Sequence, residues 1–506
     1  MLFNSGIRYA IAMAITFGLC SCLFDTAHET AQPDKSLAYT VKISNEVGGL
    51  RCSVFVEVRR WPSQDSLVFQ LPAYYPDNPR MPVPGIQPSA IRIQNASGKL
   101  LSYAKASAPF SQGGGTWITV PANTRILSYA VDLDPNSPAA FGPPMPRIKT
   151  GVQLLDGSLL FILPANGTSL AAHWRNPIAL TLNWQVDNGL PWMGNSAVNF
   201  GSNYQLMFVR GAVNPARSLE FQAGAHTVTL YSNQASDSLN LPALAVQFQR
   251  WIPLMEKHLG ALPWQRLWIG TNSVHAGIEG IGGYWFRPEY AGNSEVHLHE
   301  LTHSFVGILQ GDLDDPWWKE AVTNYLGQIM AVEDGFYTDS AEGIYLEQAY
   351  DGVPSVMQYA LSDPTLRDRF FHPLDSDYVD RPPQDYYTLL YNKGAQASMF
   401  IDAWLLKNSN GKHDLFEAVR MLYSSGKPGF SRAQLVAVLD SLSRQRSDTL
   451  LQSLCDKPGA FTKVRLQQGF ADLKTYGRFN FTGANPALAK RTHGKPGAWR
   501  EDLIKK

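Results

Sequence analysis

The chain has 506 residues, and its 43 basic and 43 acidic side chains give a formal net charge of zero at pH 7. Hydrophobic residues make up 44% and charged residues 17%, which is typical of a folded globular protein and excludes a disordered one. The balanced charge and the lack of a long basic run argue against nucleic acid as a partner.

The chain begins with an apolar segment. Arg8 is the only charge before a run that continues to Leu19 and ends at Cys20-Ser21-Cys22. This run is too short to span a membrane and predicts a signal peptide over residues 1–22. Its end resembles a bacterial lipobox, which predicts a lipid anchor at Cys22 and a periplasm-facing lipoprotein of the cell envelope. The alternative is a soluble secreted protein. Residues 23–36 are predicted to form a polar tether.

Residues 37–190 have β-like patterning. Apolar and polar residues alternate over 52–59, and Gly and Pro separate further short apolar segments. This predicts a β-rich, sandwich-like N-terminal domain. Export would permit a disulfide between Cys52 and Cys455, but because they lie in different predicted domains we expect two buried free thiols.

Residues 191–365 are predicted to form a second domain, with a helix over 241–259 and a strand over 264–270. A further predicted helix over 295–309 contains His299-Glu300-Leu301-Thr302-His303, an H-E-x-x-H motif. Residues i and i+4 share a helix face, so both imidazoles could bind one Zn²⁺. Glu300 would then take a proton from a water molecule that zinc activates. The alternative is an ordinary helix with two surface histidines.

Glu320 supplies the third ligand in this interpretation. An acidic pair followed by Pro316 predicts a helix start, and Glu320 comes about one turn later. A hydrolytic zinc keeps three protein ligands and one open position. The sequence therefore predicts metal-assisted hydrolysis, most often of a peptide bond. His297 would face away from this metal.

Two further segments are candidates for the site. Gly277-Ile278-Glu279 could be a turn-rich sheet edge, but beside a metal Glu279 could pair with the α-ammonium of a substrate, with Gly277 in the same binding segment. Such pairing is typical of an exopeptidase. Tyr391 could donate a hydrogen bond to the oxyanion, or it could be a core tyrosine at the start of a helix.

The remaining chain is predicted to be mostly helical over residues 366–482. Helical spacing of apolar residues occurs at 388–406, 414–423, 432–442 and 448–454. Residues 483–506 are predicted to form a polar tail.

These motifs together resemble a known family. H-E-x-x-H at 299–303, Trp-x-x-Glu ending at 320, Gly-x-Glu at 277–279 and Tyr-x-Lys-Gly at 391–394 resemble, in this order, the gluzincin aminopeptidases, above all the glycyl aminopeptidase-like family, a relative of aminopeptidase N. The resemblance implies an α+β multidomain fold with a thermolysin-like catalytic domain between the β-rich and helical domains. It also implies one zinc per chain and an aminopeptidase acting on peptides. Residues 157–161 resemble a strand of that family.

The chain departs from the family at three places. Gly280 stands where the family commonly has His, Ala321 stands where it usually has Gly, and no PDZ domain is evident after the helices. Two alternatives therefore stay open beside the aminopeptidase: a zinc endopeptidase with an open cleft, and a catalytically weak member that acts as an envelope binding protein.

Overall fold

The computed structural model has an N-terminal β-rich part, a middle part that contains the H-E-x-x-H motif and Glu320, and a C-terminal helical part. The residues described are 35–46, 49–62, 67–71, 89–108, 115–132, 153–165, 178–187, 192–194, 197–200, 206, 208–213, 215, 217–232, 239–271, 277–307, 316–336, 394–424, 430–455 and 463–478. The predicted signal peptide, the predicted anchor residue Cys22, residues 23–34 of the predicted tether, Tyr391 and the predicted tail lie outside them, whereas Ser36, the last residue of the predicted tether, begins the first strand. Among the described helices, none has both the length and the apolar character needed to cross a membrane.

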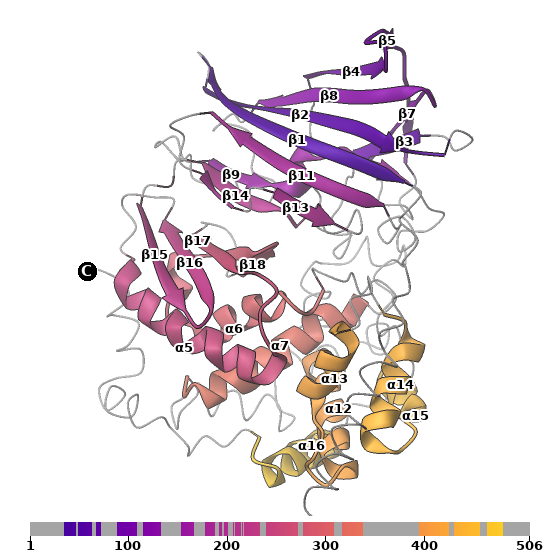
Figure 1. The fold of residues 1–506 in the computed structure, drawn as a ribbon. Coiled ribbons are helices and arrows are strands. Elements are labelled where there is room, and N and C mark those ends of the chain that lie inside the picture. Colours follow the sequence, from indigo (N-terminus) through magenta and orange to yellow (C-terminus); the bar gives the residue numbers. More distant parts are fainter. Residues whose placement is uncertain are drawn as a thin grey trace, which may run out of the picture.

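The N-terminal part contains two larger β-sheets, drawn in colours from indigo to magenta in Figure 1. One has seven strands in the order β13-β11-β1-β2-β8-β4-β5, and the other has the order β10-β3-β7-β6. The strands are β1 (Ser36–Glu46), β2 (Gly49–Arg60), β3 (Leu67–Leu71), β4 (Ser89–Asn95), β5 (Leu100–Leu101), β6 (Ala104–Ser107), β7 (Thr116–Val120), β8 (Thr124–Asp132), β10 (Leu163–Ala165), β11 (Ala179–Val186) and β13 (Ala197–Phe200).

The two sheets share one hydrophobic core. Val54 and Val56 of β2 are buried together with Phe69 of β3 and Ile118 of β7, whereas Phe55 of β2 is 43% exposed. The period of two over 52–58 therefore predicted the buried face of this strand correctly. The seven-stranded sheet continues past the predicted boundary at residue 190, because β13 pairs with β11. Cys52 is a buried free thiol, as expected, and the side chain of Cys455 lies outside the description.

The segment at 157–161 is not the strand that the family resemblance implied. Residues Gly157–Leu160 form a single helical turn, α2, which follows β9 (Gln153–Asp156). The N–H of Gly157 donates to the carbonyl of Val209 at 2.7 Å, and a Cβ at this glycine would lie 2.2 Å from the carbonyl oxygen of Leu206. Because two backbones meet here, the chain turns at Gly157 instead of continuing β9. β9 also pairs with β14 (Arg210–Val213), whose other neighbour is β12 (Trp192–Met193).

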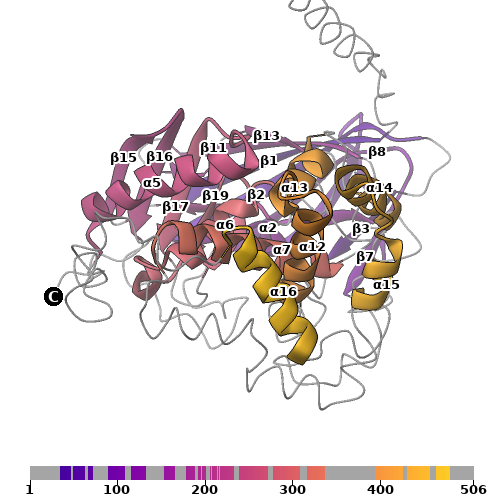
Figure 2. The same cartoon turned by 90° about the horizontal axis from the view of Figure 1, so that it is seen from below.

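The middle of the molecule contains a five-stranded sheet, with the strand order β15-β16-β17-β19-β18, together with three α-helices and one short 3-10 helix. The elements are β15 (Arg217–Ala223), β16 (His226–Ser232), α5 (Leu241–Leu259), β17 (Arg266–Thr271), β18 (Gly277–Gly280), β19 (Gly283–Phe286), the short helix η2 (Pro288–Tyr290), α6 (Ser294–Thr302) and α7 (Pro316–Glu333). Helix α5 has the predicted bounds, and the side chain of Asn240 caps it by accepting from the N–H of Ala243. The predicted strand over 264–270 is present as β17. Figure 2 shows the helices on one side of this sheet.

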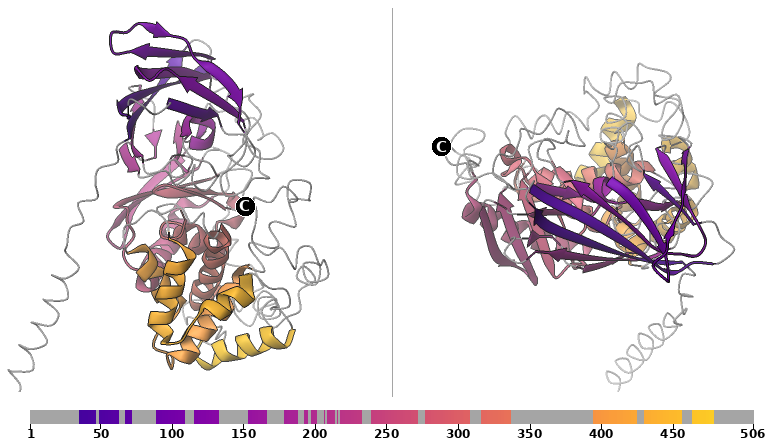
Figure 3. Two further views of the ribbon diagram at one scale, coloured as in Figure 1. Left: turned by 90° about the vertical axis from the view of Figure 1, so that its right-hand side faces the viewer. Right: turned by 90° about the horizontal axis from the view of Figure 1, so that it is seen from above.

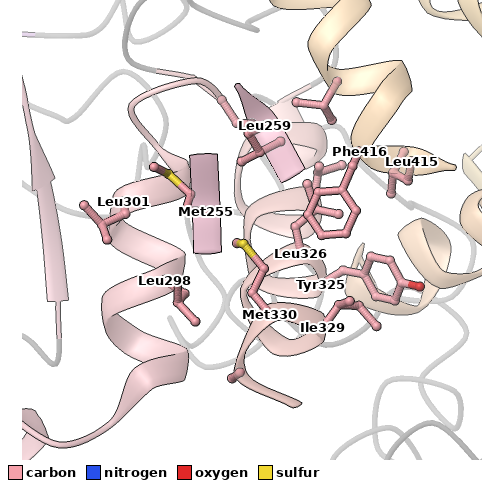
Figure 4. Packing of buried hydrophobic residues seen from close by; sticks show 14 of the residues in the cluster. Met255, Leu259, Leu298, Leu301, Tyr325, Leu326, Ile329, Met330, Leu415 and Phe416 are labelled. Atoms are coloured by element: carbon pink, nitrogen blue, oxygen red, sulfur yellow. The ribbon is translucent and has the colours of Figure 1, made fainter. Parts of the chain in front are cut away.

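The C-terminal part is helical, as predicted. Its helices are α12 (Gly394–Asn408), α13 (Leu415–Tyr423), α14 (Arg432–Ser443), α15 (Asp448–Cys455) and α16 (Lys463–Thr475). They pack below the middle layer, opposite the N-terminal sheets (Figures 1 and 3). One core joins these helices to α5, α6 and α7, and Figure 4 shows Leu298 of α6, Met330 of α7 and Phe416 of α13 among its members. A continuous apolar core therefore joins the middle part to the C-terminal part.

Candidate metal centre

The two motif histidines lie at the end of α6. The helix is shorter than the predicted 295–309, because it ends at Thr302 and the chain continues in turns. His303 is the first residue beyond the helix but keeps helical dihedral angles, with φ −60° and ψ −18°. Its imidazole therefore still projects on the same side as that of His299, and the two rings lie 4.8 Å apart between centroids. Gly307 follows with φ +98°, a conformation that favours glycine.

Helix α7 brings Glu320 against this face of α6. It begins at Pro316, as predicted. The helices pack closely at Gly327, where a Cβ would lie 3.1 Å from the backbone nitrogen of His299. Glu320 Oε2 lies 3.5 Å from His299 Nε2 and 3.6 Å from His303 Nε2. The three predicted ligands are therefore brought together, and all three are buried.

The geometry of these three atoms fits a tetrahedral zinc ion. The two Nε2 atoms lie 3.1 Å apart, and metal–ligand bonds of roughly 2.0–2.1 Å at tetrahedral angles separate ligand atoms by about 3.3 Å. Nδ1 of His303 donates to the carbonyl of Val306 at 3.1 Å, so Nε2 keeps its lone pair for a metal. Among the described residues, Glu320 Oε2 has no hydrogen-bond partner although it is buried. A cation would satisfy this oxygen.

The electrostatics of the site shift the pKa values of its carboxyl groups in opposite directions. Burial opposes the charge on Glu320, but His303 and Lys319 outweigh burial and lower its pKa well below the usual value. Burial also opposes the charge on His303, but Glu320 and Glu279 outweigh it and raise its pKa to about 9. For Glu300, burial dominates and raises the pKa well above the usual value. Glu320 is therefore suited to hold a cation, and Glu300 to hold a proton.

Gly277 allows Glu300 to take its position. The carboxylate lies directly against β18, and a Cβ on Gly277 would come within 2.1 Å of Glu300 Oε1. The other oxygen, Oε2, is buried and has no hydrogen-bond partner among the described residues. The sequence interpretation placed Gly277 in a substrate-binding segment. In the structure its contact is with the catalytic candidate Glu300, for which the missing side chain makes room.

Glu279 lies beside the metal ligands, but its partner was not foreseen. Glu279 and Glu300 each offer an oxygen, and His303 a nitrogen, all within 4.8 Å of one another. The carboxylate of Glu279 accepts from Nζ of Lys319 at 2.5 Å. Burial raises the pKa of Glu279, but the charge and hydrogen bond of Lys319 together with the charge of His303 outweigh burial and bring the pKa to about 2. Sequence reasoning missed Lys319 because a lysine in an amphipathic helix usually reaches solvent.

Two other residues of the sequence analysis have structural roles. His297 is buried on the opposite side of α6, stacked on Trp251 at 4.8 Å between ring centroids, which confirms the prediction that it faces away from the metal. Gly280 is the position where the family commonly has His. A Cβ there would lie 2.6 Å from Cγ of Arg210, so in this chain the neighbouring packing excludes a larger residue.

No protein-family model matches the sequence. No curated protein matches it either. Solved structures do match the fold. An aminopeptidase N family protein from Idiomarina loihiensis is 12% identical with a TM-score of 0.57, and the match covers 85% of this chain and 78% of that one. Leukotriene A4 hydrolase from Saccharomyces cerevisiae is 14% identical with a TM-score of 0.51, over 87% and 72% of the two chains.

A third similar structure is a mutant of the M1 zinc metallopeptidase from Deinococcus radiodurans. It is 16% identical with a TM-score of 0.50, and the match covers 85% of this chain and 96% of that one. Together with the described sheets and helices, these similarities show that the chain has the fold of the aminopeptidase N and M1 zinc metallopeptidase structures.

Proposed function

We propose that this chain is a zinc-dependent metallopeptidase. The observation that carries the proposal is the convergence of His299, His303 and Glu320 at distances suited to one zinc ion. Oε2 of Glu300, which has no hydrogen-bond partner within the described part of the chain, is buried beside them. Two of the structures with a similar fold are described as an aminopeptidase N family protein and a zinc metallopeptidase, which supports the same reaction class.

Different residues of the chain would bind the metal and transfer protons during hydrolysis. His299, His303 and Glu320 would hold the zinc ion, which when bound supplies a Lewis acid for activating water and polarising the scissile carbonyl. Glu300 would accept the proton of the attacking water and return it to the leaving amine. The elevated pKa of Glu300, caused by its burial, favours this role because the carboxylate holds a proton more strongly than an exposed glutamate does.

Two parts of the proposal rest on the sequence alone. Tyr391 is proposed as the donor to the oxyanion, and Cys22 as a lipidated residue that attaches the chain to the bacterial envelope. Both residues lie outside the described part of the chain.

Removal of N-terminal residues is the narrower form of this function. The family resemblance and the neighbouring aminopeptidase N family fold support it. It requires Glu279 to bind the α-ammonium of the substrate, and Glu279 already accepts from Lys319 in this structure. The residues therefore support peptide-bond hydrolysis more directly than the removal of N-terminal residues.

Metal analysis combined with peptide hydrolysis tests the proposal. We expect one zinc per chain, loss of hydrolysis after treatment with a chelator, and recovery on addition of one equivalent of zinc. The substrates should include peptides with free and with acetylated amino ends, so that either specificity is detected. A chain that binds zinc stoichiometrically but cleaves none of them would contradict the proposal and favour the binding-protein alternative.

A further inference from the structure

Lys319 holds a buried ammonium group beside the candidate metal centre. Its side chain is 3% exposed, and Nζ lies 2.5 Å from Oε1 of Glu279 and 3.4 Å from Oε1 of Glu320. The same nitrogen lies 4.4 Å from the centroid of the Phe208 ring. A buried lysine is stable only when its charge is paired, and here it is paired with carboxylates of the site itself.

The fold makes specific room for this side chain. Gly307 adopts φ +98°, and a Cβ at this residue would lie 2.5 Å from Cγ of Lys319. The methylene stem of Lys319 therefore runs past a glycine at the end of the α6 turns, and its ammonium ends at β18. Since the stem is enclosed and the ammonium is paired, the position of Nζ is determined by packing as well as by charge.

Glu279 is the group that the α-ammonium of a substrate would have to reach. Its carboxylate lies within 4.8 Å of the ligand atoms of both Glu300 and His303. In a peptide, only the Cα atom separates the α-ammonium from the first carbonyl carbon. If that carbonyl were attacked beside Glu300, the ammonium would therefore lie close to Glu279, next to Nζ of Lys319.

Among the described residues, the charges of the site are balanced without a substrate ammonium. When Glu300 is in the ionised form that can accept a proton from water, Glu279, Glu300 and Glu320 carry three negative charges, and Lys319 with a bound Zn²⁺ would carry three positive ones. A free α-ammonium would add a fourth positive charge close to Lys319, where like charges repel strongly because the site is buried.

We propose that Lys319 fills the ammonium-binding position with a charge of the chain itself, so that the site accepts peptides that lack a free α-ammonium there. Suitable substrates are N-blocked peptides and internal peptide segments. This inference rests on the proposed peptidase function. It makes Lys319 a specificity-determining residue.

A different role for Lys319 must be separated from this one. Its Nζ lies 3.4 Å from Oε1 of Glu320, so it could serve only to orient that ligand. In that case, removing the ammonium would weaken zinc binding and would leave the preference between free and blocked peptides unchanged.

The test compares wild type with Lys319→Ser and Lys319→Gln on matched peptides that have free or acetylated amino ends. We expect wild type to cleave the acetylated peptides at least about tenfold more efficiently. Either substitution should shift the ratio of kcat/KM towards the free peptides by roughly 10- to 100-fold, because Glu279 becomes available for a charge-assisted hydrogen bond. Lys407→Ser is the matched control, since Lys407 is 62% exposed and pairs with Asp472.

Binding provides a readout that does not depend on turnover. Calorimetry in the Glu300→Gln background should show that Lys319→Ser gains affinity for the free peptide and not for the acetylated one, with zinc content unchanged. Lys319→Gln serves if the serine variant folds poorly. A wild-type preference for free peptides, or a variant that loses zinc without changing the preference, would overturn the inference. If wild type cleaves no peptide, the proposed function fails, while the binding comparison still decides the role of Lys319.

Discussion

The two sides of helix α6 place histidines in opposite environments. On one side, His297 lies among aromatic rings, and its Nε2 donates to the carbonyl of Ala291 at 3.0 Å while Nδ1 accepts from the hydroxyl of Tyr284 at 2.6 Å. On the other side, His299 and His303 face the carboxylate of Glu320. Burial lowers the pKa of His297 to about 3, whereas nearby carboxylates outweigh burial and raise the pKa of His303 to about 9.

The difference shows what turns a buried histidine into a candidate ligand. Burial alone keeps an imidazole neutral, and both nitrogens of His297 are used by hydrogen bonds within the fold. His303 uses only Nδ1 for such a bond, and its Nε2 faces other potential ligands. The decisive feature is therefore a nitrogen directed at a carboxylate and not already committed to the backbone.

The largest effect should follow from removing a ligand. We expect His303→Ala to reduce zinc affinity by at least about 100-fold and to abolish hydrolysis, because only two protein ligands remain. Zinc content after dialysis against a weak chelator measures the loss. A variant that retains stoichiometric zinc would show that His303 is not a ligand and would contradict the contrast between the two sides of α6.

The next effect concerns the base and not the metal. Glu300→Gln should keep zinc and lose roughly 10²- to 10⁴-fold in kcat, because the amide cannot accept a proton from water. Equal turnover by wild type and Glu300→Gln would remove Glu300 from the mechanism.

Gly277→Ala should lower kcat by a smaller factor than Glu300→Gln. The new methyl group displaces the carboxylate of Glu300, which it would otherwise contact at 2.1 Å.

His297→Ala should affect stability and not metal binding. The substitution leaves a cavity among Trp251, Phe248 and Phe286 and deprives the hydroxyl of Tyr284 of its partner. We expect a loss of about 3 kcal/mol in the free energy of unfolding. Denaturant unfolding measures the loss, and metal analysis of the folded variant should still give one zinc. Loss of zinc with unchanged stability would mean that the two sides of α6 are not independent.

The smallest effect is expected at the partly exposed ion pair between His258 and Glu333. This pair contrasts with the fully buried His297. A hydrogen bond with His258 at 2.6 Å outweighs burial and, with help from Lys257, lowers the pKa of Glu333 to about 2. Because the folded pKa lies below the ordinary 4.5, the stabilisation is complete above pH 4.5 and is lost as the pH falls towards 2. Glu333 is 37% exposed, so we expect Glu333→Gln to cost only about 0.5 kcal/mol at pH 7.

The pH dependence of this difference is the measurement. Unfolding curves of wild type and Glu333→Gln should converge between pH 4.5 and pH 2. A constant gap across this range would show that the effect of the substitution comes from packing and not from the charge.

Local patterns predicted a large part of this molecule. The alternation over residues 52–58, the bounds of α5 and the start of α7 at Pro316 all follow from side-chain periodicity and capping. The i, i+4 spacing of His299 and His303 correctly predicted that the two imidazoles project from the same face of the helix. Local pattern failed where distant backbones meet, as at Gly157, which lies against residues 206 and 209. It failed at Lys319 for the same reason, since its partner Glu279 lies 40 residues earlier in the chain.

The close contact of α6 and α7 at Gly327 has a consequence for the stability of the whole C-terminal half. The ligands come from both helices, so a metal bound between them acts as a cross-link across the helix interface. Helix α7 also packs against α12 within the core that holds the C-terminal helices. Binding of the proposed zinc ion would thereby be coupled to the cooperative unfolding of segments far from the metal, and the apolar core would transmit that coupling.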